Sequence, residues 1–260
     1  MIGDLTITSV ETVTGFDMSG NYWFTLDELK DATVAQSQET TDITGKQGRV
    51  ISRMKKNKTI KVSGTNGLIS GGLMEVQTGS AFQDKDTNVL WRDYLTVSSN
   101  AATTSYKAIG TAGNEIEALY IKTSDGTIGT KLVQDSTAAS GKFAYNPSTK
   151  ALTFSGLSDG TEIMVVYNRK ISASVLANSA DTFSGKAMLY VDAMAEDKCG
   201  NLFRVQFFIP KADFSGEFSI EMGDNPAVHA FEADAMAGAC TAGGALWTYT
   251  VFGANAADVA

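Results

Sequence analysis

The chain has 260 residues, of which 43% are hydrophobic and 19% charged, a balance typical of folded rather than disordered proteins. Its 21 basic and 29 acidic side chains give a formal net charge of −8. The single histidine, His229, excludes a multi-histidine metal site. Because no run approaches about 18 consecutive apolar residues, we expect no membrane-spanning helix.

The composition predicts strands joined by tight turns. Glycine is abundant at 25 residues, proline is scarce at 3, and serine and threonine are frequent. A chain of this length can form one large β domain or a core domain with an insert. The first residues lack a basic region followed by an apolar run, so no signal peptide is expected. Cys199 and Cys240 are therefore expected to be reduced.

The N-terminal region predicts two strands. Residues 5–13 alternate weakly between apolar and polar side chains and indicate an edge strand. Residues 22–34 indicate a longer strand, because YWFTLD at its start places apolar and more polar side chains on opposite faces. A short helix over residues 26–30 is the alternative, since DELK favours a helix.

A compact basic segment follows within residues 42–72. No acidic residue lies between Gly45 and Lys61, and without the basic residues of this segment the rest of the chain has a net charge of −15. Charge separated in this way is a physical basis for self-association, in which the basic segment of one copy docks on an acidic face of another. The basic residues are Lys46, Arg49, Arg53, Lys55, Lys56, Lys58 and Lys61.

Ordered elements are expected after the basic segment. Residues 59–62 predict a strand and residues 64–67 a turn. Residues 70–82 predict a short helix capped by Ser70. The basic segment is therefore expected to be a loop held between ordered elements, and a solvated, mobile loop is the alternative.

A change of composition follows the next predicted strand, residues 90–97. Residues 98–104 (SSNAATT) are small and polar and indicate a boundary. Beyond it, Asp125-Gly126 and Asp159-Gly160 lie between apolar runs and suit tight hairpin turns. Residues 105–170 are therefore expected to form an inserted β-hairpin module or further strands of the same sandwich. The division into domains is then 1–104 plus 171–260, and 105–170.

The clearest strands are predicted near the C-terminus. Residues 187–194 and 202–209 are expected to form a hairpin around a turn at 196–201. In residues 217–222, alternation places Glu217 and Glu221 on one polar face, and nothing nearby has the spacing of a calcium loop. Further strands are predicted at residues 227–236 and 246–252, and residues 253–260 are expected to be frayed.

Two runs of the sequence resemble a known family. The first, at residues 43–80, is ITGKQGRVISRMKKNKTIKVSGTNGLISGGLMEVQTGS, and the second, at residues 184–225, is SGKAMLYVDAMAEDKCGNLFRVQFFIPKADFSGEFSIEMGDN. Both are similar to the major tail proteins that build the tail tube of long-tailed bacteriophages and related prophages. The two runs cover roughly a third of the chain and carry assembly patterns rather than catalytic signatures.

This resemblance implies a fold and a role. The expected fold is all-β, with two packed antiparallel sheets, one short flanking helix and a long loop at residues 40–58. Copies are expected to form stacked hexameric rings, the tail tube through which DNA is ejected, with no catalytic activity, no cofactor, no metal and no membrane. Expected partners are further copies of the chain, the tape measure, tail terminator and baseplate or distal tail proteins, and DNA in passage. The expected location is the virion tail, assembled in the bacterial host cytoplasm.

Two groups of residues are candidates for function under this resemblance. The basic loop is expected to contact the neighbouring ring, and the bore of the tube is expected to be electronegative, which repels the phosphates of passing DNA. Direct DNA binding by the basic run is disfavoured, because the run contains no aromatic residue for base stacking. The contact residues are Lys46, Arg49, Arg53, Lys55, Lys56 and Lys58, and the candidate acidic residues of the bore are Asp27, Glu217 and Glu221.

The alternative function is a binding module, either a β-sandwich adhesin for a host glycan or a capsid decoration protein. It predicts an aromatic platform on a loop, whereas Tyr106, Tyr120 and Tyr145 fall in predicted strands. An enzyme that uses the acidic residues is a third, weaker alternative.

Overall fold

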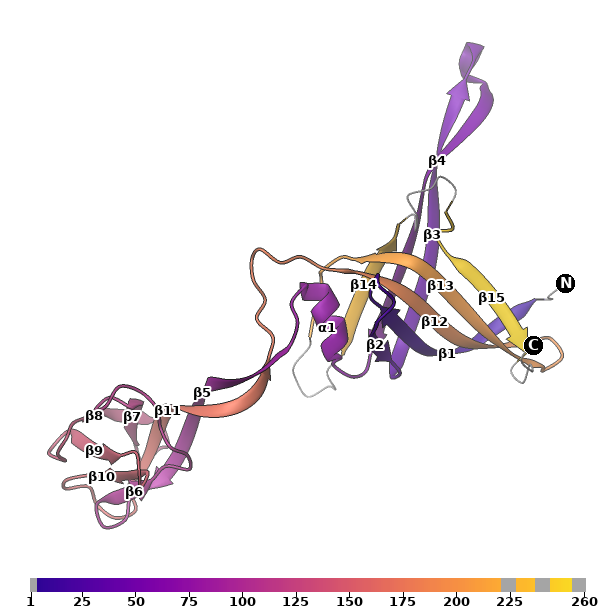
Figure 1. Cartoon of the computed structure of the whole chain (residues 1–260). Coiled ribbons are helices and arrows are strands. Elements are labelled where there is room, and N and C mark those ends of the chain that lie inside the picture. The colour runs from indigo at the N-terminus through magenta and orange to yellow at the C-terminus, as the bar shows by residue number, and fades with distance from the viewer. Residues whose placement is uncertain (1–3, 221–227, 237–243, 254–260) are drawn as a thin grey trace. The chain divides into compact units, whose positions relative to one another are not determined.

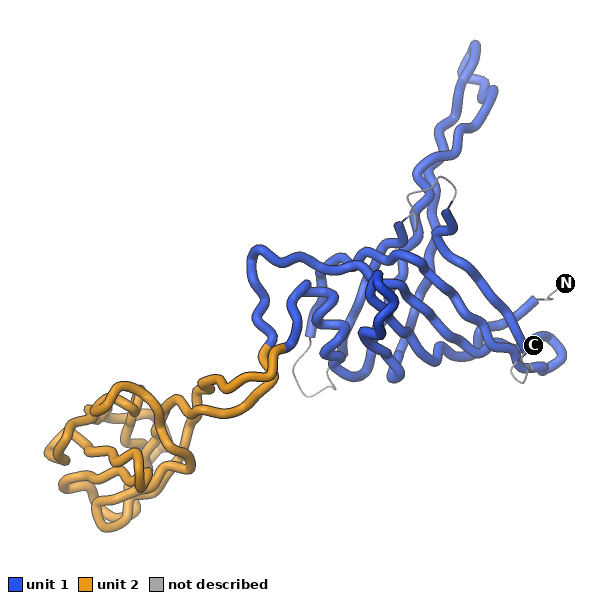
Figure 2. The backbone as a smooth tube through the Cα atoms, viewed as in Figure 1, with its two compact units in different colours: residues 1–82, 176–260 blue, residues 83–175 orange. Residues whose placement is uncertain are grey.

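The computed structural model of the chain describes residues 4–220, 228–236 and 244–253, and it is rich in strands, with one short α-helix in this part of the chain (Figure 1). The strands form two sheets, which confirms the predicted all-β class. The chain divides into two compact units, residues 1–82 with 176–260 and residues 83–175 (Figure 2).

The first unit contains a sheet in the order β2-β1-β12-β13-β14-β4-β3, with β15 also paired to β13, and the paired strands are antiparallel. Its strands are β1 (Leu5–Phe16), β2 (Tyr22–Leu26), β3 (Leu29–Thr44), β4 (Val50–Asn66), β12 (Lys186–Asp197), β13 (Leu202–Phe214), β14 (His229–Ala235) and β15 (Thr248–Gly253).

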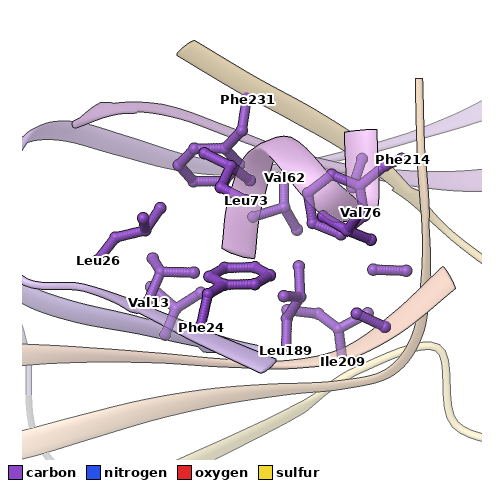
Figure 3. Close-up of a cluster of buried hydrophobic side chains, with 14 residues drawn as sticks. Val13, Phe24, Leu26, Val62, Leu73, Val76, Leu189, Ile209, Phe214 and Phe231 are labelled. Carbon is purple, nitrogen blue, oxygen red and sulfur yellow. The ribbon is translucent and has the colours of Figure 1, made fainter. Parts of the chain in front are cut away.

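Helix α1 (Gly71–Thr78) covers the core side of this sheet. The helix begins where Ser70 Oγ accepts a hydrogen bond from the backbone N–H of Leu73 at 3.3 Å. It ends at Gly79, whose φ of 70° is the left-handed conformation that glycine adopts without strain. Leu73 and Val76 project into a cluster of buried side chains from the strands, including Phe231 (Figure 3).

Several local predictions for the first unit are wrong in detail. Strand β1 has the predicted edge only over residues 5–12, because it pairs with β12 along its length and β2 covers its other side at residues 13–16. The predicted strand at residues 22–34 is divided by a bend at residues 27–28, and the alternative helix does not form there. Strand β4 continues through Gly64, where a turn was expected. A Cβ atom at Gly64 would lie 2.6 Å from the Asp31 carbonyl oxygen and 2.9 Å from the Phe231 ring, so this glycine permits close packing.

The C-terminal predictions are largely confirmed. Strands β12 and β13 form the expected hairpin, with Leu189 opposite Ile209. Residues 217–219 do not form the strand predicted for residues 217–222, and Ile220 makes an isolated bridge with His229. The rest of that predicted strand, Glu221 and Met222, lies outside the described residues, as do Cys240 and residues 254–260.

The second unit has a separate sheet in the order β5-β11-β7-β8-β9-β10-β6, in which β8 and β9 pair in parallel. It includes the hairpin expected at Asp125-Gly126. A second cluster of buried apolar residues, among them Leu119, forms its core. Its strands are β5 (Gln83–Thr96), β6 (Ala101–Thr103), β7 (Ile116–Lys122), β8 (Ile128–Gln134), β9 (Lys142–Asn146), β10 (Ala151–Thr153) and β11 (Glu162–Val175).

The division at residues 104 and 105 predicted from composition falls inside this second unit. Strands β5 and β6 belong with β7–β11, because β5 pairs with β11 along its whole length, from Gln83 opposite Val175 to Thr96 opposite Glu162.

His229 links β14 to the start of α1 and is fully buried. Its Nδ1 accepts a hydrogen bond from the backbone N–H of Ser70 at 3.2 Å, so the ring proton lies on Nε2, which donates to Gln77 Oε1 at 2.7 Å. Burial lowers the pKa of His229 below its ordinary value near 6.5, because the charged ring loses its hydration. The residue is a structural one that holds the helix on the sheet.

The buried neutral ring makes the stability of the first unit depend on pH. Below the unfolded-state pKa of about 6.5, His229 binds a proton in the unfolded chain but stays neutral in the folded chain. The free energy of unfolding therefore decreases as the pH falls. We expect the thermal midpoint of the wild type to fall more steeply between about pH 7 and 5 than that of His229→Gln, which retains the carboxylates but not the imidazole. Equal slopes in calorimetry would contradict this assignment.

Candidate functional site

The basic segment lies on a β-hairpin rather than on a loop. Strands β3 and β4 pair from Leu29 opposite Asn66 as far as Thr44 opposite Val50, and a 3₁₀ turn, Lys46–Gly48, joins them. Every residue from 35 to 59 except Gly45 is exposed. We call residues 35–59 the hairpin arm; it extends beyond the rest of the sheet of the first unit (Figure 1). The predicted loop at residues 40–58 is therefore wrong in its secondary structure.

The hairpin arm has the opposite charge to the rest of its unit. It contains six basic and two acidic residues, a net charge of +4. The remainder of the first unit has a net charge of −12, whereas the nine basic and nine acidic residues of the second unit cancel. The charge separation read from the sequence thus lies within one unit, on one projecting element.

One of the six predicted contact residues already forms an ion pair within its own hairpin. Arg53 donates from Nε to Asp42 Oδ1 at 2.6 Å and from Nη2 to Asp42 Oδ2 at 3.2 Å, and this bond raises the pKa of Arg53. The five other basic side chains of the arm form no ion pair with any described residue. They are Lys46, Arg49, Lys55, Lys56 and Lys58.

The two faces of the arm both carry positive charge. Lys55 lies opposite Thr40 and shares a face with Arg53, whereas Lys56 lies opposite Glu39 on the other face. Glu39 accepts a hydrogen bond from Asn57 Nδ2 at 2.8 Å. The hairpin therefore brings all six predicted residues onto one narrow element.

The tip of the arm also carries apolar side chains that the sequence reasoning missed. Ile43, Val50, Ile51 and Met54 are all exposed, and Ile51 has 70% of its surface accessible to solvent. Exposed side chains of this size in such a short segment are typical of an interaction surface. The signal in the sequence was the interleaving of apolar and basic residues in RVISRMKK.

The candidate acidic residues of the bore lie on different elements. Asp27 is exposed in the connection between β2 and β3. Glu217 is exposed after β13. The pKa of Lys61 is raised mainly by the hydrogen bond that Lys61 Nζ donates to Glu232 Oε1 at 2.7 Å, and the charge of Glu217 adds a smaller effect. Glu221 lies outside the described residues.

The face of β1, β12 and β13 that points away from the core contains a polar row that was not predicted. Asp192 accepts hydrogen bonds from Thr12 Oγ1 at 3.2 Å and from Gln206 Nε2 at 2.8 Å. Beside this row, the rings of Tyr190 and Phe208 stack with centroids 4.5 Å apart. The signal was the alternation in KAMLYVDAMAED, which places Asp192 in phase with Tyr190 and opposite to the buried Val191.

Comparison with known proteins identifies one family. A family model described as the YomU/Tube protein family matches residues 5–249, which is nearly the whole chain. The search among curated proteins gave no match. Within the described residues, no helix has the length and apolar character needed to cross a membrane.

Proposed function

Because the chain belongs to the YomU/Tube protein family, a family of phage tail tube proteins, we propose that its copies form six-fold rings that stack into the tube of a phage tail. Proteins of this family are structural components of the virion tail. The observation that supports ring stacking here is the separation of charge, with +4 on the hairpin arm and −12 on the rest of the same unit.

The arm is the element that reaches the next ring. At about 3.3 Å per residue, ten residues of paired strand extend about 30 Å, and two paired strands are stiffer than a loop. Five of its basic side chains have no ionic partner among the described residues, so they can pair with acidic groups of a neighbouring copy. Arg53 contributes less, since Asp42 already holds its guanidinium.

The bore of the tube is a conduit for DNA during ejection. The face of β1, β12 and β13 that contains Asp192 is a candidate for the wall of the bore. The carboxylate of Asp192 would repel DNA phosphates, and the polar groups beside it are already hydrogen-bonded to one another. Asp27, Glu217 and Glu221 remain candidates for the same repulsion. DNA then passes without specific contacts.

A position in the phage tail determines which other proteins the chain would contact. The ends of a stacked tube would contact the tape measure, tail terminator and baseplate or distal tail proteins, with assembly in the host cytoplasm. We infer that residues 83–175, which have a core of their own, are a module inserted between α1 and β12.

The glycan-binding alternative would use the second unit. Trp91 and Tyr106 are partly exposed there, but the Arg169 guanidinium already lies over both rings, 4.5 Å from the Trp91 centroid and 3.6 Å from that of Tyr106. A ring face covered by a guanidinium group is not available for stacking a sugar. This geometry favours the tube over the adhesin.

Electron microscopy of the purified full chain tests the proposal. Rings or hollow rods of constant diameter are expected, with a central channel that fills with stain. A preparation that contains only separate particles at every concentration and salt condition would contradict assembly into a tube and favour the binding module.

A further inference from the structure

The first unit contains a groove that its own side chains leave unfilled. It lies between β1 and β3 on the core side of the sheet and has a volume of about 410 Å³. Buried Val191 and Ala193 contribute to its lining, and Ile7, at one side, has 51% of its surface exposed. The other lining residues are Thr8, Ser9, Val10, Lys30, Asp31, Ala32, Val34 and Phe207.

Both strands beside the groove have backbone edges that are unpaired within the described residues. Strand β2 pairs with β1 only over residues 13–16, so the edge of residues 5–12 that faces away from β12 is open. Strand β3 pairs with β4 alone in the described part of the chain. A partly apolar groove beside open strand edges is a site at which another chain can dock.

We propose that this groove is the seat for the tip of the hairpin arm of a second copy. The residues that enter it are the exposed apolar ones of the tip, Ile43, Val50, Ile51 and Met54. The inference rests on the proposed tube, and it names the surface of the neighbouring copy that the arm contacts.

The geometry excludes the arm of the same copy as the occupant. Val34 lines the groove, and the turn at Gly45 is eleven residues further along a paired strand. At about 3.3 Å per residue, the tip lies roughly 35 Å from the groove of its own chain, at the far end of a hydrogen-bonded ladder. Only a different molecule can bring a tip to this site.

Charge favours a second copy of the chain over an unrelated partner. The arm has a net charge of +4, and the body that contains the groove has −12, so two copies attract each other in this orientation. The lining contains one residue of each sign, Lys30 and Asp31, and is otherwise polar or apolar. Long-range attraction therefore guides the arm toward the body, and contact between apolar side chains retains the tip in the groove.

The variant Ile7→Glu tests the groove directly. A charge placed at the half-exposed side of the groove would lose hydration when the apolar tip enters, so we expect the concentration needed for polymerisation to rise about tenfold or more. The matched control is Ile128→Glu in the second unit, where Ile128 has 59% of its surface exposed. The control should polymerise as the wild type does, and both variants should keep the wild-type melting temperature within a few degrees.

Cross-linking provides a second readout in a Cys199→Ser, Cys240→Ser background. Chains with Ile51→Cys are mixed with chains with Ala32→Cys and oxidised, and a disulfide-linked dimer is expected because the two Cβ atoms approach within about 4.5 Å. A mixture of Ile51→Cys and Ile128→Cys should remain unlinked. Wild-type tubes, normal polymerisation of Ile7→Glu and no cross-link together would overturn the groove and leave the tube proposal intact. A wild-type chain that never polymerises would overturn both.

Discussion

Replacing Lys55 and Lys56 with Glu should abolish ring stacking while leaving the monomer folded. The two reversals change the net charge of the hairpin arm from +4 to zero, so the attraction toward the acidic body of a neighbouring copy is lost. Both side chains are exposed and neither forms an ion pair in the described structure, so the fold of the first unit should be unaffected. Sedimentation velocity at low salt, supported by circular dichroism, measures both effects.

The matched control is Lys107→Glu with Lys131→Glu. These lysines are also exposed, and the change in total charge is the same, but both lie in the second unit. The control should polymerise normally. If the Lys55, Lys56 double variant forms tubes as readily as the control at low salt, the electrostatic part of this account is wrong. Raising the salt concentration should weaken polymerisation of the wild type, because exposed charges are screened within about 10 Å at 0.1 M.

The second large effect is expected for Leu73→Ala in helix α1. Leu73 is fully buried in the core of the first unit beside Phe231 and other large side chains (Figure 3). Removing such a side chain costs about 2–5 kcal/mol, since the transfer energy is lost and a cavity remains. Urea denaturation of the Lys55, Lys56 variant, which should remain unassembled, checks this value against the same background with Leu73 intact.

The two separate cores predict that this loss is confined to the first unit. Leu119→Ala removes an equally buried leucine from the core of the second unit and is the matched control. Leu73→Ala should lower the midpoint of one unfolding transition and Leu119→Ala the midpoint of the other. A single transition that both variants shift equally would show that the two units unfold as one.

The sequence was most informative where one side of a strand is buried. In β12 and β13, alternation of apolar and polar residues located both strands and their hairpin, because burial imposes a period of two. The same reasoning failed in the arm. Residues 35–59 are exposed on both faces, so no buried side imposes an alternation of apolar and polar residues there. The pairing of β3 with β4 there depends on backbone hydrogen bonds and cross-strand contacts such as Asp42 with Arg53.

The candidate sites were predicted unevenly for a related reason. A run of basic residues is visible in one stretch of sequence, so the proposed contact residues between Lys46 and Lys58 can be named from the sequence alone. The groove combines residues from β1, β3, β12 and β13, which only the folded sheet brings together. Residues 64–67 were misread because Gly64 indicates a turn in isolation, whereas its packing against Phe231 is a tertiary contact.

The most direct test of the account is removal of the arm. Replacing residues 38–58 with Asn-Gly joins Ser37 to Thr59, a cross-strand pair, through a two-residue turn and leaves the buried core in place. Under conditions in which the full chain forms long tubes, the shortened chain should sediment no faster than a single ring, with an unchanged thermal midpoint. Tubes of the shortened chain as long as those of the wild type would contradict the claim that the arm joins one ring to the next.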